Sequence, residues 1–103
     1  METFMHALFL KHKVKPGRRD DVETIWRRHM QPAIAANEGH VSYIYSFGSD
    51  PDTIAAFQVY RSRAAAEAFL KTVAYQSYLA ESRGLLEHDP EVVELAPRWI
   101  KPA

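Results

Sequence analysis

Residues 4–10 read Phe-Met-His-Ala-Leu-Phe-Leu, and both alternating faces of this extended stretch are largely apolar. One face carries Met5, Ala7 and Phe9, and the other carries Phe4, Leu8 and Leu10. A strand with one wet face alternates apolar with polar residues, so this strand needs cover on both faces. In a chain of 103 residues the helices can cover only one face. The stretch therefore predicts a homodimer, in which a second copy of the chain covers the other face of the sheet.

Size and composition indicate one domain over residues 1–103 and exclude several classes of protein. The 13 Lys and Arg residues balance 13 Asp and Glu residues, so the basic surface of a nucleic-acid-binding domain is missing. The chain has no cysteine, which excludes disulfides, thiolate metal sites and cysteine nucleophiles. It lacks the pattern of a signal peptide and any stretch near the roughly 20 apolar residues that span a bilayer. We expect a soluble, cytoplasmic protein with no nucleic-acid or membrane partner.

The pattern along the chain predicts the order strand, helix, strand, strand, helix, strand. The expected strands cover residues 4–14, 40–49, 53–61 and 92–96. Helices gathered on one face of such an antiparallel sheet give an α+β sandwich of the ferredoxin-like βαββαβ type. The free face of the sheet would carry aliphatic and aromatic side chains, and an apolar patch of that size marks an interface. Two sheets packed face to face around a two-fold axis would bury it.

Capping and breaking residues locate the helices. Aspartates at residues 20–21 suit the positive end of the first helix, and Pro32 is expected to bend or interrupt it. Ser62 should cap the second helix, and Thr72 should cap a further helical piece. Residues 89–90 (Asp-Pro) are expected to end that piece.

The five histidines give no pattern of metal ligands. His6 and His12 share a strand face, but six residues at about 3.3 Å each separate them by about 20 Å. We interpret His12, His40 and His88 as ordinary surface or core histidines. His29 shares an apolar helical stripe, and His6 lies on the strand face that should meet the helices. These two are therefore the candidates for acid–base chemistry.

An aromatic set made of Trp26, Phe69, Tyr75 and Tyr78 lies on helix faces that should look at the sheet. Such residues usually fill a core. Alternatively they form a flat apolar pocket between helices and sheet, with tyrosine hydroxyls and His29 as its sparse polar groups. The chain has no glycine-rich phosphate loop and no nucleophile elbow, so nucleotide or flavin binding through such a loop is not expected.

Several segments together resemble the antibiotic biosynthesis monooxygenase family, a branch of the dimeric α+β barrel superfamily. The segments cover residues 14–20 (VKPGRRD), 38–43 (EGHVSY), 50–53 (DPDT), 57–62 (FQVYRS), 68–75 (AFLKTVAY) and 95–97 (LAP). Within the 68–75 segment, Phe69 stands where the family often has Trp or His, and Ala74 stands where it often has His. Tyr75 matches the family in chemical type. Haem-degrading members need an asparagine and a histidine where this chain has Leu10 and Leu79, so haem degradation is disfavoured.

The resemblance implies a cofactor-independent monooxygenase that binds no metal and acts on a small aromatic, phenolic or quinol-type molecule. Such a substrate, once deprotonated, can itself pass an electron to dioxygen, so the protein supplies a dry pocket and a proton acceptor. We assign His29, or else His6, as the proton acceptor and Tyr75 as the hydrogen-bonding partner. The pocket walls are assigned to Leu8, Leu10, Trp26, Met30, Phe69 and Tyr78.

Two other functions stay open at this point. The chain could be a non-oxidative isomerase or cyclase of the same fold. It could also be a non-catalytic binding dimer in which the aromatic residues only fill the core.

Overall fold

A computed structural model describes residues 5–101, and it has the expected antiparallel sheet with helices on one face. The strands are β1 (His6–Lys13), β2 (His40–Phe47), β3 (Thr53–Tyr60) and β4 (Glu91–Leu95). They are hydrogen-bonded in the order β2-β3-β1-β4, and each neighbouring pair is antiparallel. This is the ferredoxin-like α+β fold. Phe4, with which the expected first strand began, lies outside the described residues.

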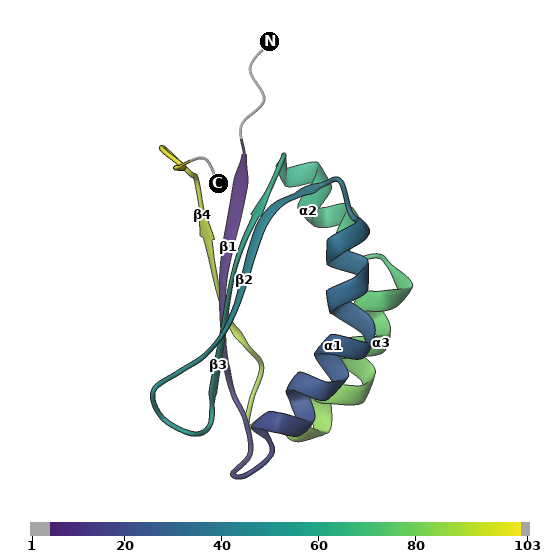
Figure 1. Cartoon of the computed structure of the whole chain (residues 1–103), viewed down its shortest axis with the longest axis vertical. Coiled ribbons are helices and arrows are strands. Elements are labelled where there is room, and N and C mark those ends of the chain that lie inside the picture. The colour runs from purple at the N-terminus through teal and green to yellow at the C-terminus, as the bar shows by residue number, and fades with distance from the viewer. Residues whose placement is uncertain (1–4, 102–103) are drawn as a thin grey trace.

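The helices α1 (Arg19–Ala36), α2 (Arg63–Phe69) and α3 (Val73–Ser82) all lie on one side of the sheet (Figure 1). The two expected N-caps are confirmed. Ser62 Oγ accepts a hydrogen bond from the Ala65 amide, and Thr72 Oγ1 accepts one from the Tyr75 amide. Each cap satisfies an amide that has no partner within its helix.

Helix α1 runs through Pro32 without a break, so the interruption considered there is wrong. Proline removes one backbone hydrogen bond, but side chains on both sides of it hold the helix in place. Trp26 and Met30 are buried before Pro32, and Ala33 and Ile34 pack on the same core after it. Tertiary packing therefore outweighs the lost hydrogen bond.

The end of the last helix also differs from the expectation. Helix α3 ends at Ser82, and the 3-10 turn η1 (Arg83–Leu85) follows, well before Asp89-Pro90. Beyond this turn Leu86 pairs with Val14 by an isolated β-bridge. Leu85 and Leu86 pack on a small core cluster of Val14, Val22 and Ile54. The chain leaves the helix early because its two leucines close this end of the core.

The register of the sheet separates a helix-facing side from an outer side. Leu10 of β1 lies opposite Ala56 of β3, which in turn lies opposite Tyr45 of β2. These residues, with Leu8 and His12, face the helices. The outer side carries Ile44, Phe57 and Val93, whose exposed fractions are 59%, 38% and 47%. The segment after β4 lies on this outer side (Figure 1), where Trp99 and Ile100 help to line an apolar groove of about 450 Å³.

Candidate functional site

A small, partly enclosed chamber lies between the helices and the sheet, and its volume is about 30 Å³. Strands β1, β2 and β3 and helices α1 and α3 all contribute side chains to it. The polar lining residues are His12, Tyr43, Tyr45, Gln58, Tyr75 and Tyr78. The apolar lining residues are Leu10, Trp26, Met30, Ala56, Leu79 and Pro90. A space of this size holds one or two water molecules, and it is too small for an aromatic ring.

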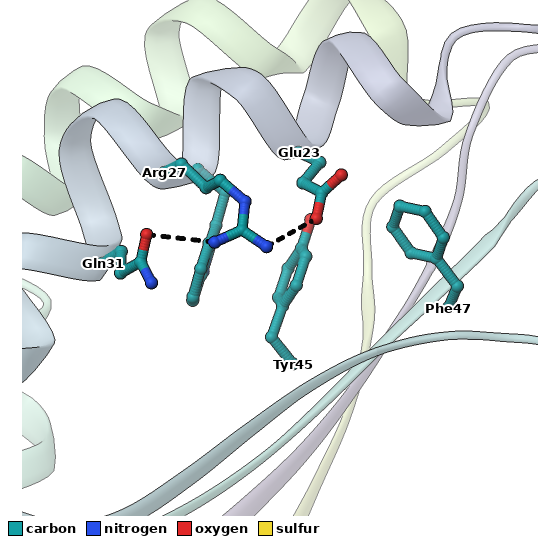
Figure 2. A pocket seen from close by; sticks show the side chains of 6 residues that line it. Glu23, Arg27, Gln31, Tyr45 and Phe47 are labelled. Atoms are coloured by element: carbon teal, nitrogen blue, oxygen red, sulfur yellow. Dashed lines mark hydrogen bonds and ion pairs between the residues drawn. The ribbon is translucent and has the colours of Figure 1, made fainter.

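An open groove of about 430 Å³ lies between α1 and β2, where Arg27 of α1 faces Tyr45 and Phe47 of β2 (Figure 2). The Arg27 guanidinium lies 3.0 Å from the Glu23 carboxylate and donates a hydrogen bond of 3.2 Å to the Gln31 side chain. The groove thus has an aromatic floor under a polar rim. Its volume is within the range of small-molecule sites.

Trp26 and Tyr45 line both the chamber and the groove. Their rings are stacked, with centroids 4.0 Å apart and planes inclined by 16°. We call these two rings the shared wall. An aromatic pair of this kind contributes only about 0.5–1.5 kcal/mol beyond its area burial. Moving one ring aside would give up this stacking and part of the ring's burial, and it would join the two spaces.

The tyrosines of the chamber are hydrogen-bond donors rather than bases. Burial raises the pKa of Tyr43 to about 12 and also raises the pKa of Tyr45, Tyr75 and Tyr78. Tyr43 Oη accepts a hydrogen bond of 3.3 Å from Trp26 Nε1. At neutral pH all four side chains keep their protons, and their hydroxyls can stabilise a negative charge nearby.

His12 lines this chamber, although the sequence reasoning gave it no role in the site; the same holds for Tyr43, Tyr45 and Gln58. The His12 side chain is 7% exposed, and its Nδ1 has no hydrogen-bond partner among the described residues. Burial lowers the pKa of His12 to about 4, so the ring is neutral at neutral pH. The available signal was strand alternation, because His12 shares a face with Leu8 and Leu10.

The structure brings some of the expected site residues together. Leu10, Trp26, Met30, Tyr75 and Tyr78 line the chamber. Leu8 and Phe69 do not line it, but they belong to the core that packs around Trp26 and Tyr78.

His29 and His6 lie elsewhere. His29 Nε2 is 2.6 Å from the carboxylate of Glu81, so this histidine joins α1 to α3. His6 Nε2 is 3.4 Å from the carboxylate of Glu94 and lines a separate surface pocket of about 360 Å³. For either histidine to act as proton acceptor, the substrate would have to bind outside the chamber.

Within residues 5–101, no three His, Asp or Glu side chains gather in a way that could hold a metal ion. In the same part of the chain, no helix combines the length and the apolar character needed to cross a bilayer.

Comparison with known proteins agrees with this architecture. The family model described as antibiotic biosynthesis monooxygenase matches residues 5–81. A protein from Chloroflexus aurantiacus J-10-fl, provisionally named an antibiotic biosynthesis monooxygenase, is 26% identical with a TM-score of 0.82, over 95% of this chain and 97% of that one. Rv0793 from Mycobacterium tuberculosis is 25% identical with a TM-score of 0.82, over 96% and 98% of the two chains. No curated protein sequence matches the chain.

Proposed function

This chain belongs to the antibiotic biosynthesis monooxygenase family, and on that premise we propose that it is a cofactor-independent monooxygenase for a small phenolic or quinol-type substrate. The supporting observation is the pairing of an aromatic-floored groove with a narrow, hydroxyl-lined chamber behind the shared wall. The groove fits a planar ring, and the chamber offers hydroxyl donors to an oxygen that becomes negatively charged.

The proposed reaction needs no group beyond the substrate and dioxygen. Deprotonation of the substrate hydroxyl makes the ring electron-rich enough to reduce dioxygen. One oxygen atom then becomes a carbonyl oxygen at a ring C–H position. The second oxygen leaves as water, with the hydrogen of that C–H and the hydroxyl proton. The protein contributes exclusion of water, a proton acceptor and hydrogen bonds to the oxyanion.

Tyr75 is the proposed hydrogen-bonding partner of the oxyanion, because its hydroxyl stays protonated and its side chain lines the chamber. Leu10, Trp26, Met30 and Tyr78 form the proposed walls, and Leu8 and Phe69 support them from the core. Entry of the ring requires the shared wall to open, since the chamber itself holds only about 30 Å³.

An oxygen electrode tests this proposal. Wild-type protein with a panel of quinols and anthrone-like phenols should consume one dioxygen per product, above the rate of autoxidation. Tyr75→Phe should lower kcat by about a hundredfold, since it removes a donor to the oxyanion. His88→Gln, at an exposed histidine that does not line the chamber, is the matched control. Unchanged turnover by Tyr75→Phe would remove Tyr75 from the mechanism.

The same experiment separates the two rival functions. Product formation with a flat oxygen trace would indicate an isomerase or cyclase. A non-catalytic binding dimer is favoured by one specific observation, the small volume of the chamber. That rival would show neither oxygen uptake nor product with any member of the panel.

We further propose that the protein is a homodimer through the outer side of its sheet. The support is the exposed row of Ile44, Phe57 and Val93, with Trp99 beside it. Sedimentation or light scattering should give twice the mass of 11.8 kDa. Ile44→Lys should give monomers, whereas Val73→Lys, which charges an 82% exposed residue on the helix side, should not. A wild-type monomer at micromolar concentration would contradict the proposal.

A further inference from the structure

His12 is one of three residues, with His40 and Tyr45, that carry a buried side-chain polar atom without a hydrogen-bond partner among the described residues. It lies on β1 opposite Ile54 of β3, and both residues face the helices. Its side chain is more than nine-tenths buried, and its Nδ1 finds no hydrogen-bond partner within the described part of the chain. A buried polar atom without a partner costs about 1–3 kcal/mol. Such groups are uncommon in folded proteins and call for an explanation.

Elimination within the chamber points to the same residue. The described residues that line it include no Asp, Glu, Lys or Arg. Burial keeps the tyrosine hydroxyls protonated. The Gln58 amide is not basic, and its Oε1 already accepts a hydrogen bond of 2.6 Å from Tyr60 Oη. His12 therefore offers the one basic nitrogen on this lining.

We propose that His12 is the proton acceptor of the reaction and that the substrate is an aromatic molecule whose hydroxyl group reaches into the chamber past Trp26 and Tyr45. This inference rests on the proposed function. In the step, the substrate O–H bond breaks, its electron pair stays on oxygen, and an N–H bond forms at the free ring nitrogen of His12. The result is a phenolate beside an imidazolium. The neighbouring hydroxyls of Tyr45 and Tyr75 can donate to the phenolate oxygen.

The burial of His12 is consistent with this role. In the ligand-free protein burial disfavours the imidazolium, so the ring keeps a free lone pair at physiological pH. A phenolate formed beside the ring supplies the missing counter-charge. The described lining of the chamber holds no other charged side chain, so each of the two charges depends on the other for its stabilisation. Ionisation of a bound phenol should therefore depend on His12.

The probe 4-nitrophenol tests this dependence, because its phenolate absorbs visible light and its neutral form does not. The measurement is made below the solution pKa of the probe, with wild type, His12→Gln and the surface control His88→Gln. With wild type and the control, the ratio of phenolate to neutral phenol should be about tenfold higher for bound probe than for free probe, which corresponds to one pKa unit. His12→Gln should abolish the excess. Equal phenolate in His12→Gln, neutral bound probe, or no binding to wild type would overturn the proposal.

Two further measurements keep the outcome clear. If His12→Gln does not fold, nitrogen NMR of the wild-type histidine rings reports protonation of His12 when the probe binds. A ring that stays neutral would overturn the inference, as would loss of the phenolate signal in His29→Ala instead. Oxygen uptake distinguishes the two proposals. Ionised probe, together with no oxygen uptake by any quinol or phenol of the panel, would refute the monooxygenase and leave His12 as the acceptor of a bound phenol's proton. If His12→Gln consumed oxygen at the wild-type rate, the His12 assignment would be refuted and the monooxygenase proposal would stand.

Discussion

Replacing His12 by glutamine should make the protein less sensitive to mild acid. In the folded chain His12 is buried in a chamber whose described lining carries no charged side chain. Around it lie the hydroxyls of Tyr43 and Tyr45 from β2 and of Tyr75 from α3, with the amide of Gln58 from β3. None of these groups supplies a negative charge at pH 5–7, so a proton on His12 has no counter-charge in the free protein.

The magnitude follows from the two pKa values. His12 has a pKa of about 4 in the folded state and close to its ordinary value of 6.5 when unfolded. As the pH falls, the unfolded chain takes up the proton first. The stabilisation is therefore complete above pH 6.5 and is lost as the pH falls towards 4. The free energy of unfolding should fall by about 2 kcal/mol from pH 7 to pH 5 through this group, and by about 3 kcal/mol by pH 4.

Urea unfolding at pH 7 and pH 5, at one fixed protein concentration, measures the effect. The quantity compared is the fall in the free energy of unfolding for wild type minus the fall for His12→Gln. Contributions from other groups cancel in this difference, including that of His40, whose pKa burial also lowers. His88→Gln, at an exposed histidine, should behave as wild type. If His12→Gln lost as much stability as wild type between the two pH values, the folded state would protonate His12 freely, and its burial would not control its charge.

Three further predictions concern stability and can be checked by thermal or urea unfolding. Thr72→Ala removes the N-cap that accepts a hydrogen bond from the Tyr75 amide, and it should lower the free energy of unfolding by about 1 kcal/mol. The control Thr24→Ala lies within α1, where the hydroxyl donates to a backbone carbonyl, and it should cost less. At both Gly17 and Gly84 an added Cβ would meet open space, so backbone conformation alone separates the two. Gly17→Ala should lower the free energy of unfolding by about 1–2 kcal/mol because φ is +78° there, and Gly84→Ala should be near neutral. Trp26→Ala should lower the free energy of unfolding by about 3–5 kcal/mol and open the chamber to the groove. If Trp26→Ala lost less stability than Trp26→Phe, the role of the shared wall would be contradicted.

Local patterns in the sequence were sufficient for most of the fold. Ser62 and Thr72 were predicted as N-caps because a cap depends on residues within one turn. The helix-facing side of β1, with Leu8 and Leu10, was predicted because side chains alternate along any strand. The continuous helix through Pro32 and the early end of α3 were not predicted, because distant core residues decide both.

The candidate site was only half predictable, and helix α1 shows why. Trp26 and Met30 are four residues apart and face the chamber. His29 belongs to the same apolar stripe, but one residue corresponds to about 100° of rotation around a helix. That rotation turns His29 away from the sheet and towards Glu81 of α3. Periodicity shows which residues belong to the apolar stripe of α1. The position of α3 decides which of them face the sheet and which face α3.

The sequence by itself determined the order of the elements, their caps and the two apolar faces of the sheet, since each of these depends on residues close together in the chain. Only the tertiary structure decided that His12, and not His29 or His6, shares a chamber with Tyr75. The physical reason is that residues far apart in the sequence come together around one chamber. The chamber is made by five elements far apart in sequence, and whether His12 Nδ1 finds a partner among the described residues depends on all of them together.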